Sequence, residues 1–316
     1  MLNYAIKRIA LALLIIVVVM LAMYAMVFLL PGDPATLALG PRATPALKQE
    51  LQIRMGLDQP IYVQIWNFFR NAVTGDLGYD VWSKRPVAEM ILEVFPKTLF
   101  LGVVAIGGAL AFGVALGCLA VVWRNTWIDR LLAILSVSMI SIPSFVIAIY
   151  LLLIFAVWLG WLPAIGAGEA GDPWSQLRAV ILPAFAIGIT WVGYIARLVR
   201  AAMLEVMSAN HIRTARAFGL PEHKVITRYA LRLAIIPTIS ILAVGFGSIL
   251  SSAVFVETVF SRPGIGTLIT AAVQKRNFPV VMGTVLFMTA FYLLVVTSAD
   301  LLMARLDPRV RDVFRG

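Results

Sequence analysis

The sequence predicts an all-α membrane protein that crosses the bilayer six times. Hydrophobic residues make up 61% of its 316 residues and charged residues only 13%, whereas soluble domains carry about 25% charged residues. The apolar residues also gather into six long runs, none of which contains a charge. Because about 20 apolar residues are enough for a helix to cross a bilayer, each run can form a transmembrane helix. An ordinary soluble protein is therefore excluded.

The first predicted helix covers residues 9–30 and directly follows Lys7 and Arg8. Its apolar run is longer than the core of a signal peptide, and no clear small-residue cleavage site follows it, so we expect it to be retained. The other five predicted helices cover residues 98–123, 131–159, 179–196, 235–256 and 280–299. Pro143 lies in the third predicted helix, at 131–159, where it removes a backbone hydrogen bond and is expected to kink the helix.

Residues 31–96 carry acids and bases in balance and differ from the apolar runs around them. Short amphipathic helices are expected to begin at Thr44-Pro45, at Pro60 and at Pro86, because proline suits the first turn of a helix. We expect this segment to form a small helical insertion outside the cytoplasm. The predicted organisation is a cytoplasmic N-terminus with the first helix at 1–30, the extracytoplasmic insertion at 31–96, and a five-helix core at 97–316.

Lysine and arginine are distributed unequally between the two sides of the predicted membrane. Fifteen of them lie in the segments that we assign to the cytoplasm, and four lie in the opposite short loops. Since cytoplasmic loops carry the excess of these residues, both termini are predicted to be cytoplasmic. The same placement accounts for the net charge of +10, so no nucleic-acid partner is expected. Cys118 is the only cysteine, which excludes an intrachain disulfide.

The polar segment at residues 205–235 is predicted to form a helix, a tight turn and a second helix. Asn210 is expected to cap the first helix, Gly219 to end it in the left-handed conformation, and Pro221 to begin the next. A solvated loop that merely follows the positive-inside rule is the alternative. Seven basic residues lie on or next to this segment: Arg197, Arg200, Arg213, Arg216, Lys224, Arg228 and Arg232.

The six predicted helices lack the ionisable groups that proton- or sodium-coupled carriers and voltage sensors usually place inside the membrane. No Walker A sequence occurs, so the chain is not expected to hydrolyse ATP alone. The two histidines, His211 and His223, lie in the central polar segment, and no HExxH or GxSxG occurs, so neither a metal site nor an embedded enzyme is expected. A passive membrane channel remains the alternative from another class.

Serines on the third and fifth predicted helices are candidates for lining a polar translocation path. They recur at a spacing of three or four residues, so several of them share a helix face. The alternative is that their hydroxyls bond backbone carbonyls within the helix. The candidate residues are Ser138, Ser141, Ser144, Ser248, Ser251 and Ser252.

Residues 213–219, RTARAFG, resemble the coupling loop of ABC-importer permeases of the dipeptide, oligopeptide and nickel family, where the motif reads roughly RTARAKG. The small residues of that motif match Ala215 and Gly219. Other segments resemble the same family in the same order: PGDPA at 31–35, GLDQP at 56–60, ETVFSRPGIG at 257–266 and LDPRVR at 306–311. The MLNYAIKRIA and GLDQPIYVQIWNFFRNAVTGDLG segments look closest to the glutathione-type permeases within it.

The resemblance implies a permease subunit of a binding-protein-dependent ABC importer in the bacterial cytoplasmic (inner) membrane. Such a subunit moves dipeptides, oligopeptides or glutathione by ATP-driven alternating access, and a nickel importer of the same family is the alternative. The implied partners are a second homologous permease subunit, two ABC ATPase subunits, an extracytoplasmic substrate-binding protein and the lipid bilayer. This chain would hold no cofactor itself, because ATP and Mg would bind the ATPase subunits.

The resemblance also assigns roles to residues. The residues implied to couple to the ATPase are Arg213, Thr214, Ala215, Arg216, Ala217, Phe218 and Gly219. Those implied to form an outer gate or to contact the binding protein are Glu257, Arg262, Pro263 and Gly264. A plain connecting turn at Pro263-Gly264 is the alternative for the second group.

Overall fold

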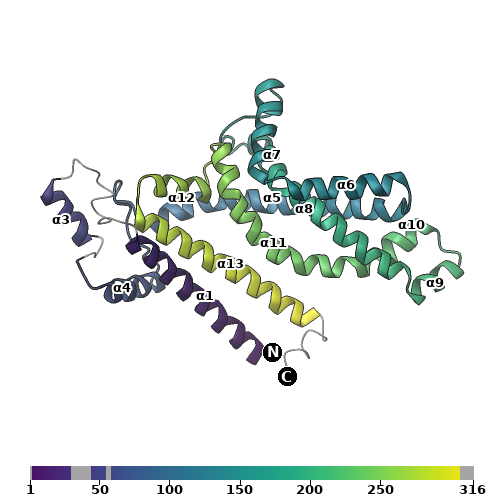
Figure 1. Cartoon of the computed structure of the whole chain (residues 1–316), viewed down its shortest axis with the longest axis horizontal. Helices are drawn as coiled ribbons and strands as arrows, with labels where there is room; N and C mark the ends of the chain where they lie inside the picture. The colour runs from purple at the N-terminus through teal and green to yellow at the C-terminus, as the bar shows by residue number, and fades with distance from the viewer. Residues whose placement is uncertain (1, 30–43, 55–57, 307–316) are drawn as a thin grey trace. The chain divides into compact units, whose positions relative to one another are not determined.

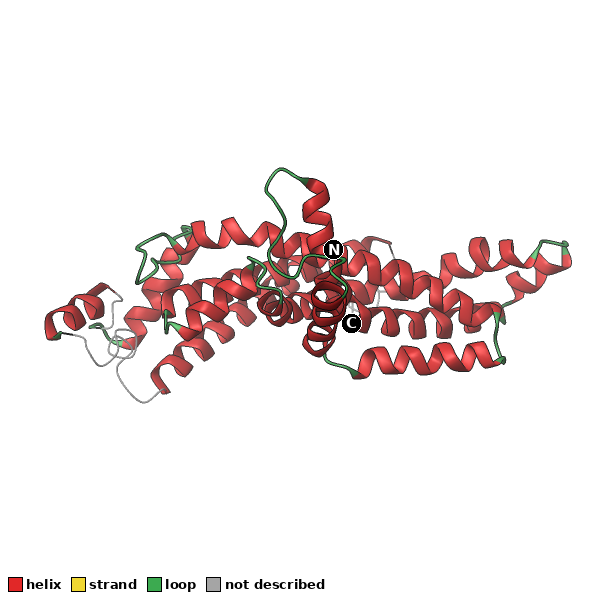
Figure 2. Ribbon diagram, turned by 90° about the horizontal axis from the view of Figure 1, so that it is seen from above, coloured by secondary structure: helices red, strands yellow, loops and turns green. Residues whose placement is uncertain are grey.

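The computed structural model describes residues 2–29, 44–54 and 58–306. Within these residues the chain is helical and contains no strand, and its one isolated β-bridge joins Tyr79 to Pro86. The predicted all-α fold class is therefore confirmed (Figures 1 and 2). The PGDPA motif at 31–35 and most of the LDPRVR motif at 306–311 lie outside the described residues.

The described elements follow one another as helices joined by short connections. In chain order they are α1 (Leu2–Leu29), α3 (Pro45–Arg54), α4 (Ile61–Val73), α5 (Val87–Val122), α6 (Trp127–Ser141), α7 (Ser144–Leu151), the π-helix η1 (Leu152–Trp158), α8 (Pro173–Met207), α9 (Asn210–Ala217), α10 (Glu222–Lys224), the π-helix η2 (Val225–Ala230), α11 (Leu231–Val259), α12 (Ile265–Gln274) and α13 (Phe278–Leu306). They form two compact units. The first comprises Met1–Pro96 with Gly264–Gly316, and the second comprises Lys97–Pro263.

Four helices, α1, α5, α8 and α13, are long and apolar enough to cross a membrane. α6 and the segment made of α7 and η1 are apolar enough only when taken together, and they are bent by 99° at the break between them, so they form either one broken span or a re-entrant loop. The break lies at Ile142 and Pro143, so the change of direction predicted at Pro143 is confirmed, and it is sharp enough to separate α6 from α7 rather than merely to kink one helix. The total of six spans, their orientation and the predicted domain limits stay predictions.

The first unit is built on α1 and α13, which lie side by side (Figure 1). Met20 and Tyr24 of α1 are buried against Met282 and Leu286 of α13. The amphipathic helix α4 covers this cluster, and its Phe68 ring meets the Tyr24 ring edge-on with the ring centroids 6.0 Å apart. Burial of one apolar face thus holds the insertion helix against the membrane helices of its unit.

The insertion helices begin close to where their sequence signals place them. The hydroxyl oxygen of Thr44 accepts a hydrogen bond from the backbone N–H of Leu47 at 3.3 Å, at the start of α3, and α4 begins directly after Pro60. The third helix differs from the prediction, because α5 runs without interruption from Val87 through Pro96 into the second span. The prediction of two separate helices there is wrong, since one missing backbone hydrogen bond does not break a helix that its neighbours support.

The second unit is organised around α8, against which α6, α7 and α11 pack. Glycines bring α5 and α6 close to it. A β-carbon at Gly117 of α5 would lie 2.9 Å from the carbonyl oxygen of Ala196, and one at Gly113 would lie 3.1 Å from another carbonyl oxygen of α8. On α8, a β-carbon at Gly193 would lie 2.5 Å from the carbonyl oxygen of Ser136. These helices therefore contact each other backbone to backbone, as small residues permit in membranes.

We expect Gly117→Ala to destabilise the protein by about 1–3 kcal/mol, because the added methyl group has no room between α5 and α8. The matched control is Gly107→Ala on the same helix, where a β-carbon would meet nothing within 4 Å. This control is expected to be neutral or to stabilise by up to ~1 kcal/mol, because alanine favours helix over glycine. Thermal denaturation of both variants in detergent tests the prediction, and equal melting temperatures would contradict it.

Candidate functional site

The central polar segment forms α9, a two-turn helix that follows the end of α8 (Figure 1). Ile212 and Ala215 of α9 are buried in a hydrophobic cluster with Met203 and Met207 of α8 and with Val225 of η2. One apolar stripe therefore fixes α9 between the end of α8 and the start of the next membrane helix. The remaining side chains of α9 face outwards.

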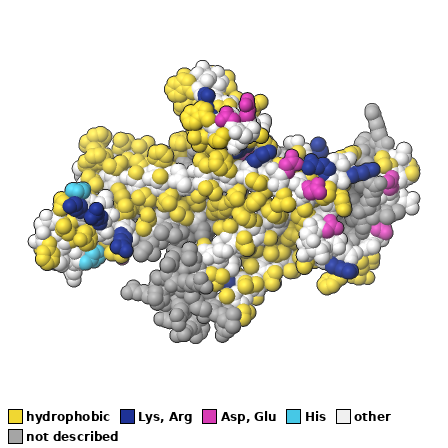
Figure 3. Space-filling model, turned by 180° about the vertical axis from the view of Figure 1, so that it is seen from behind, with side chains coloured by type: hydrophobic (Ala, Val, Ile, Leu, Met, Phe, Trp, Pro, Cys, Tyr) yellow, Lys and Arg dark blue, Asp and Glu magenta, His cyan; other side chains and the backbone are white. Residues whose placement is uncertain are grey.

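Six of the seven predicted coupling residues are exposed, and the seventh, Ala215, is 5% exposed. Ala215 therefore lies on the face of α9 that packs against α8 and η2. Phe218, directly after the helix, is 81% exposed, so its ring is available for contact with another surface. Figure 3 shows basic side chains and both histidines gathered at this end of the second unit. The exposed predicted residues are Arg213, Thr214, Arg216, Ala217, Phe218 and Gly219.

The turn after α9 confirms one prediction and overturns another. Gly219 has a φ of +73°, the left-handed conformation that glycine adopts without steric cost, so its predicted role in ending the helix is confirmed. Asn210 is the first residue of α9 and the N-cap position is Ala209, so the predicted cap at Asn210 is wrong. The cap is dispensable because burial of Ile212 and Ala215 already positions the helix.

An ion pair closes the turn on its outer side. The Arg216 guanidinium donates to both carboxylate oxygens of Glu222, at 2.6 and 3.1 Å. This contact lowers the pKa of Glu222 and raises that of Arg216. The resulting stabilisation is present above the ordinary pKa of a glutamate and is lost as the pH falls through the lowered pKa of Glu222. Both side chains are substantially exposed, so the pair contributes little to global stability and mainly orients the turn.

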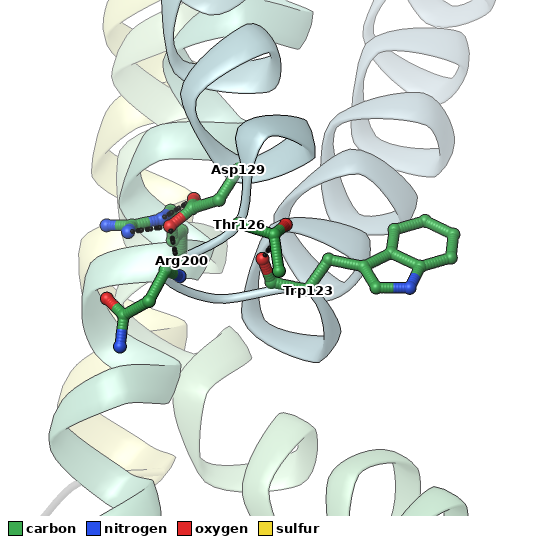
Figure 4. Close-up of polar contacts among 5 residues, drawn as sticks. Trp123, Thr126, Asp129 and Arg200 are labelled. Atoms are coloured by element: carbon green, nitrogen blue, oxygen red, sulfur yellow. Dashed lines mark hydrogen bonds and ion pairs between the residues drawn. The ribbon is translucent and has the colours of Figure 1, made fainter.

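A second ion pair, which the sequence analysis did not find, joins α6 to α8 (Figure 4). Arg200 of α8 donates to both carboxylate oxygens of Asp129 at 2.8 and 2.7 Å, and Asp129 is 6% exposed. The backbone N–H of Asn125 donates to the same carboxylate at 3.2 Å. The available signal was that Asp129 is the only acid in the short basic segment between the second and third predicted spans.

A pocket of about 340 Å³ lies beside the break at Pro143. Four of the six predicted path serines line it together with Thr190 of α8: Ser144 of α7 and Ser248, Ser251 and Ser252 of α11. The other two do not line it. Ser138 and Ser141 donate to the carbonyl oxygens of Ile134 and Val137, each four residues earlier. Their hydroxyls follow the alternative interpretation and satisfy the backbone of α6.

The residues of the predicted outer gate lie in and just after the turn that ends α11: Glu257, Arg262 and Pro263 belong to the second unit, and Gly264 is the first residue of the following segment of the first unit. Glu257 and Arg262 are at most 1% exposed, and the Glu257 carboxylate accepts a hydrogen bond from the Thr98 hydroxyl at 2.6 Å. Burial lowers the pKa of Arg262, and attraction by Glu257 opposes this shift. Gly264 is buried as well, and Pro263 is half-buried. Direct contact of Glu257 or Arg262 with another protein is therefore not available in this conformation, and a gating role stays a prediction.

These features together define a polytopic helical membrane protein with one short basic helix whose outer side chains are exposed. Residues 109–312 match the family described as binding-protein-dependent transport system inner membrane component, and residues 1–102 match the N-terminal segment of the same kind of component. The chain belongs to this family. It is thus a multi-pass protein of the cytoplasmic (inner) membrane, as predicted.

Sequence similarity to named proteins supports this assignment. The chain is 39% identical to the glutathione transport system permease protein GsiC of Shigella flexneri serotype 5b (strain 8401), over 98% of this chain and 99% of the relative. The same identity and coverage hold for GsiC of Escherichia coli (strain K12). Among solved structures, the inward-facing MetNI methionine ABC transporter matches with a TM-score of 0.58 at 17% identity, covering 69% of this chain and 96% of that one. That similarity establishes a shared fold.

Replacing Asp129 by Asn is expected to lower stability by about 1–3 kcal/mol, because Arg200 loses its charged partner while remaining two-thirds buried. The double variant Asp129→Asn, Arg200→Gln should recover part of this loss, since no uncompensated charge remains. The control is Glu205→Gln, an exposed acid near the end of α8. If Asp129→Asn and Glu205→Gln melt at the same temperature, the pair does not hold α6 to α8.

Proposed function

We propose that this chain is a permease subunit of an ABC importer that carries peptides, with glutathione as the first cargo to test. The 39% identity to a glutathione permease over almost the full length of both chains supports the cargo class. The family assignment supports the dependence on a binding protein. A nickel importer of the same family is the second candidate. A passive channel is the candidate from another class.

The importer would contain a second homologous permease, two ATPase subunits that bind ATP and Mg, and an extracytoplasmic binding protein. This chain would supply no catalytic group. Its contact with an ATPase would be made by the exposed surface of α9 and the turn after it, with Phe218 as the anchor and Arg213 and Arg216 around it. Aromatic residues and arginine are enriched in protein interfaces, and this surface offers one phenylalanine and two arginines.

The packing of the second unit supports a mechanical role for this surface. Movement of α9 acts on α8 and η2 at once, because Ile212 and Ala215 are buried among side chains of both. Since α8 is fixed to α6 by the Asp129–Arg200 pair and closely packed against α5 at Gly117, these helices would move as one body. ATP binding in the partners would in this way alter access to the pocket beside Pro143.

The residues that line that pocket offer hydroxyl and apolar groups and no charged side chain. Its polar groups include the hydroxyls of Ser144, Ser248 and Ser252, which can donate to or accept from peptide groups. The apolar part of the lining includes Trp191 and Phe255, which can contact side chains without selecting among them. Such a path would leave the choice of cargo to the binding protein.

Uptake into proteoliposomes that contain the complete importer tests the proposal. Glutathione or dipeptide uptake is expected to require both the binding protein and ATP. Uptake of Ni²⁺ in place of peptides would transfer the assignment to the nickel importers. Uptake that continues without ATP would overturn the importer assignment in favour of a channel.

Phe218→Ala is expected to weaken the binding of the ATPase subunits at least tenfold, because interface anchors typically contribute 2 kcal/mol or more (about 30-fold in Kd). Phe112→Ala is the matched control, since Phe112 lies on α5 and is 63% exposed but is far along the chain from α9. Retention of the ATPase subunits on the immobilised permease measures the effect. Equal retention by the two variants would remove Phe218 from the interface.

A further inference from the structure

The second unit contains another pocket, of about 390 Å³, which the proposed transport function does not use. It lies among α5, α6 and α8, on the part of α8 that leads to α9. Its volume falls within the range of small-molecule pockets, about 300–1,000 Å³. The apolar lining includes Leu116, Ala120, Leu132, Val137 and Ala196.

Three polar residues line this pocket, and only one of them offers an uncompensated charge. The hydroxyl of Ser136 donates to the carbonyl oxygen of Leu132 at 2.8 Å. Arg200 is held by both oxygens of Asp129, and Figure 4 shows the two side chains pointing toward each other. Arg197 is exposed and forms no ion pair with any residue in the described part of the chain. The pocket therefore combines apolar walls with one available guanidinium group.

We propose that this pocket binds an anionic phospholipid, whose acyl chain lies along the apolar walls and whose phosphate contacts Arg197. Guanidinium groups match phosphate oxygens in geometry and charge. Two of the walls belong to α5 and α8, which are long and apolar enough to cross a bilayer, and the third belongs to α6, which meets that criterion together with α7 and η1. Acyl chains are the solvent of such helices. The ligand must therefore be apolar along most of its length and anionic at one end.

The position of Arg197 along α8 fits one leaflet of the membrane. It lies ten residues, about 15 Å, before the end of α8, which continues into the basic segment around α9. Under the predicted orientation this is the cytoplasmic side, whose leaflet carries a negative surface potential and whose basic pockets between helices favour anionic head groups. The site goes beyond the proposed transport function and does not depend on the identity of the cargo.

Because the Asp129–Arg200 ion pair lies beside the pocket, a bound lipid would affect the packing of the helices that line it. Asp129 fixes Arg200 at the wall of the pocket, so a phosphate on Arg197 would add a second contact next to the joint between α6 and α8. The bound lipid would then reinforce the three helices that the pocket separates. A free phosphate ion could not do so, because it would leave the apolar walls unfilled.

The test uses the intact purified importer in neutral detergent and fluorescent phosphatidylglycerol or phosphatidylcholine as probes. We expect phosphatidylglycerol to bind more tightly than phosphatidylcholine, and Arg197→Gln to weaken phosphatidylglycerol binding about fivefold. Arg130→Gln is the matched control, because Arg130 is exposed on α6 near the same end of the unit but does not line the pocket. It is expected to bind as the unchanged protein does.

A second variant keeps the test decisive if Arg197→Gln fails to assemble. Ala133→Leu fills part of the pocket without changing its charge and should also weaken lipid binding. Equal effects of Arg197→Gln and Arg130→Gln would overturn the proposal. Equal binding of the two lipids, or full displacement by inorganic phosphate at the same concentration, would overturn it too. Cross-linking of an Ala133→Cys variant to the second permease subunit would also overturn it, because the pocket would then hold a protein helix.

Discussion

The close packing of α8 against its neighbours is the constraint on which the second unit depends. Membrane helices gain little from excluding apolar surface, since lipid is as apolar as their side chains. Close contact between helix backbones must supply the stabilisation instead, and Gly117 and Gly193 permit that contact. The bidentate Asp129–Arg200 pair adds a directional link, because a guanidinium and a carboxylate meet in one preferred geometry. Dispersion fixes the distance between these helices, and the ion pair fixes their rotation.

The exposed helix α9 acquires its properties from this arrangement. It is too short to be stable alone, and it persists because Ile212 and Ala215 are buried between α8 and η2. A surface seated in this way cannot move without moving the helices beneath it. The burial of Ile212 and Ala215 therefore joins this exposed surface to the membrane helices of the transport component.

Composition and local pattern were enough to predict the helical membrane fold, the interruption at Pro143 and the left-handed turn at Gly219. Each depends on a property of one residue or of one continuous run. Two predictions were wrong: a helix boundary near Pro96, through which α5 runs uninterrupted, and an N-cap at Asn210, where the cap position is Ala209. At both places packing overrode the local signals. The Asp129–Arg200 pair joins residues 71 positions apart, and the burial of Ala215 depends on which way α9 faces. Both are set by tertiary contacts that periodicity does not contain.

The break between α6 and α7 has a consequence for hydration. At Ile142 and Pro143 the backbone is extended and leaves the helical hydrogen-bond ladder in the middle of an apolar span. Lipid cannot satisfy peptide groups, so non-helical backbone at that depth requires protein or water around it. The pocket beside Pro143 is lined by serine and threonine side chains and has room for water next to this backbone. Water held there would hydrate the interior of the protein at this depth, so a seal against leakage of ions would have to lie above or below the pocket.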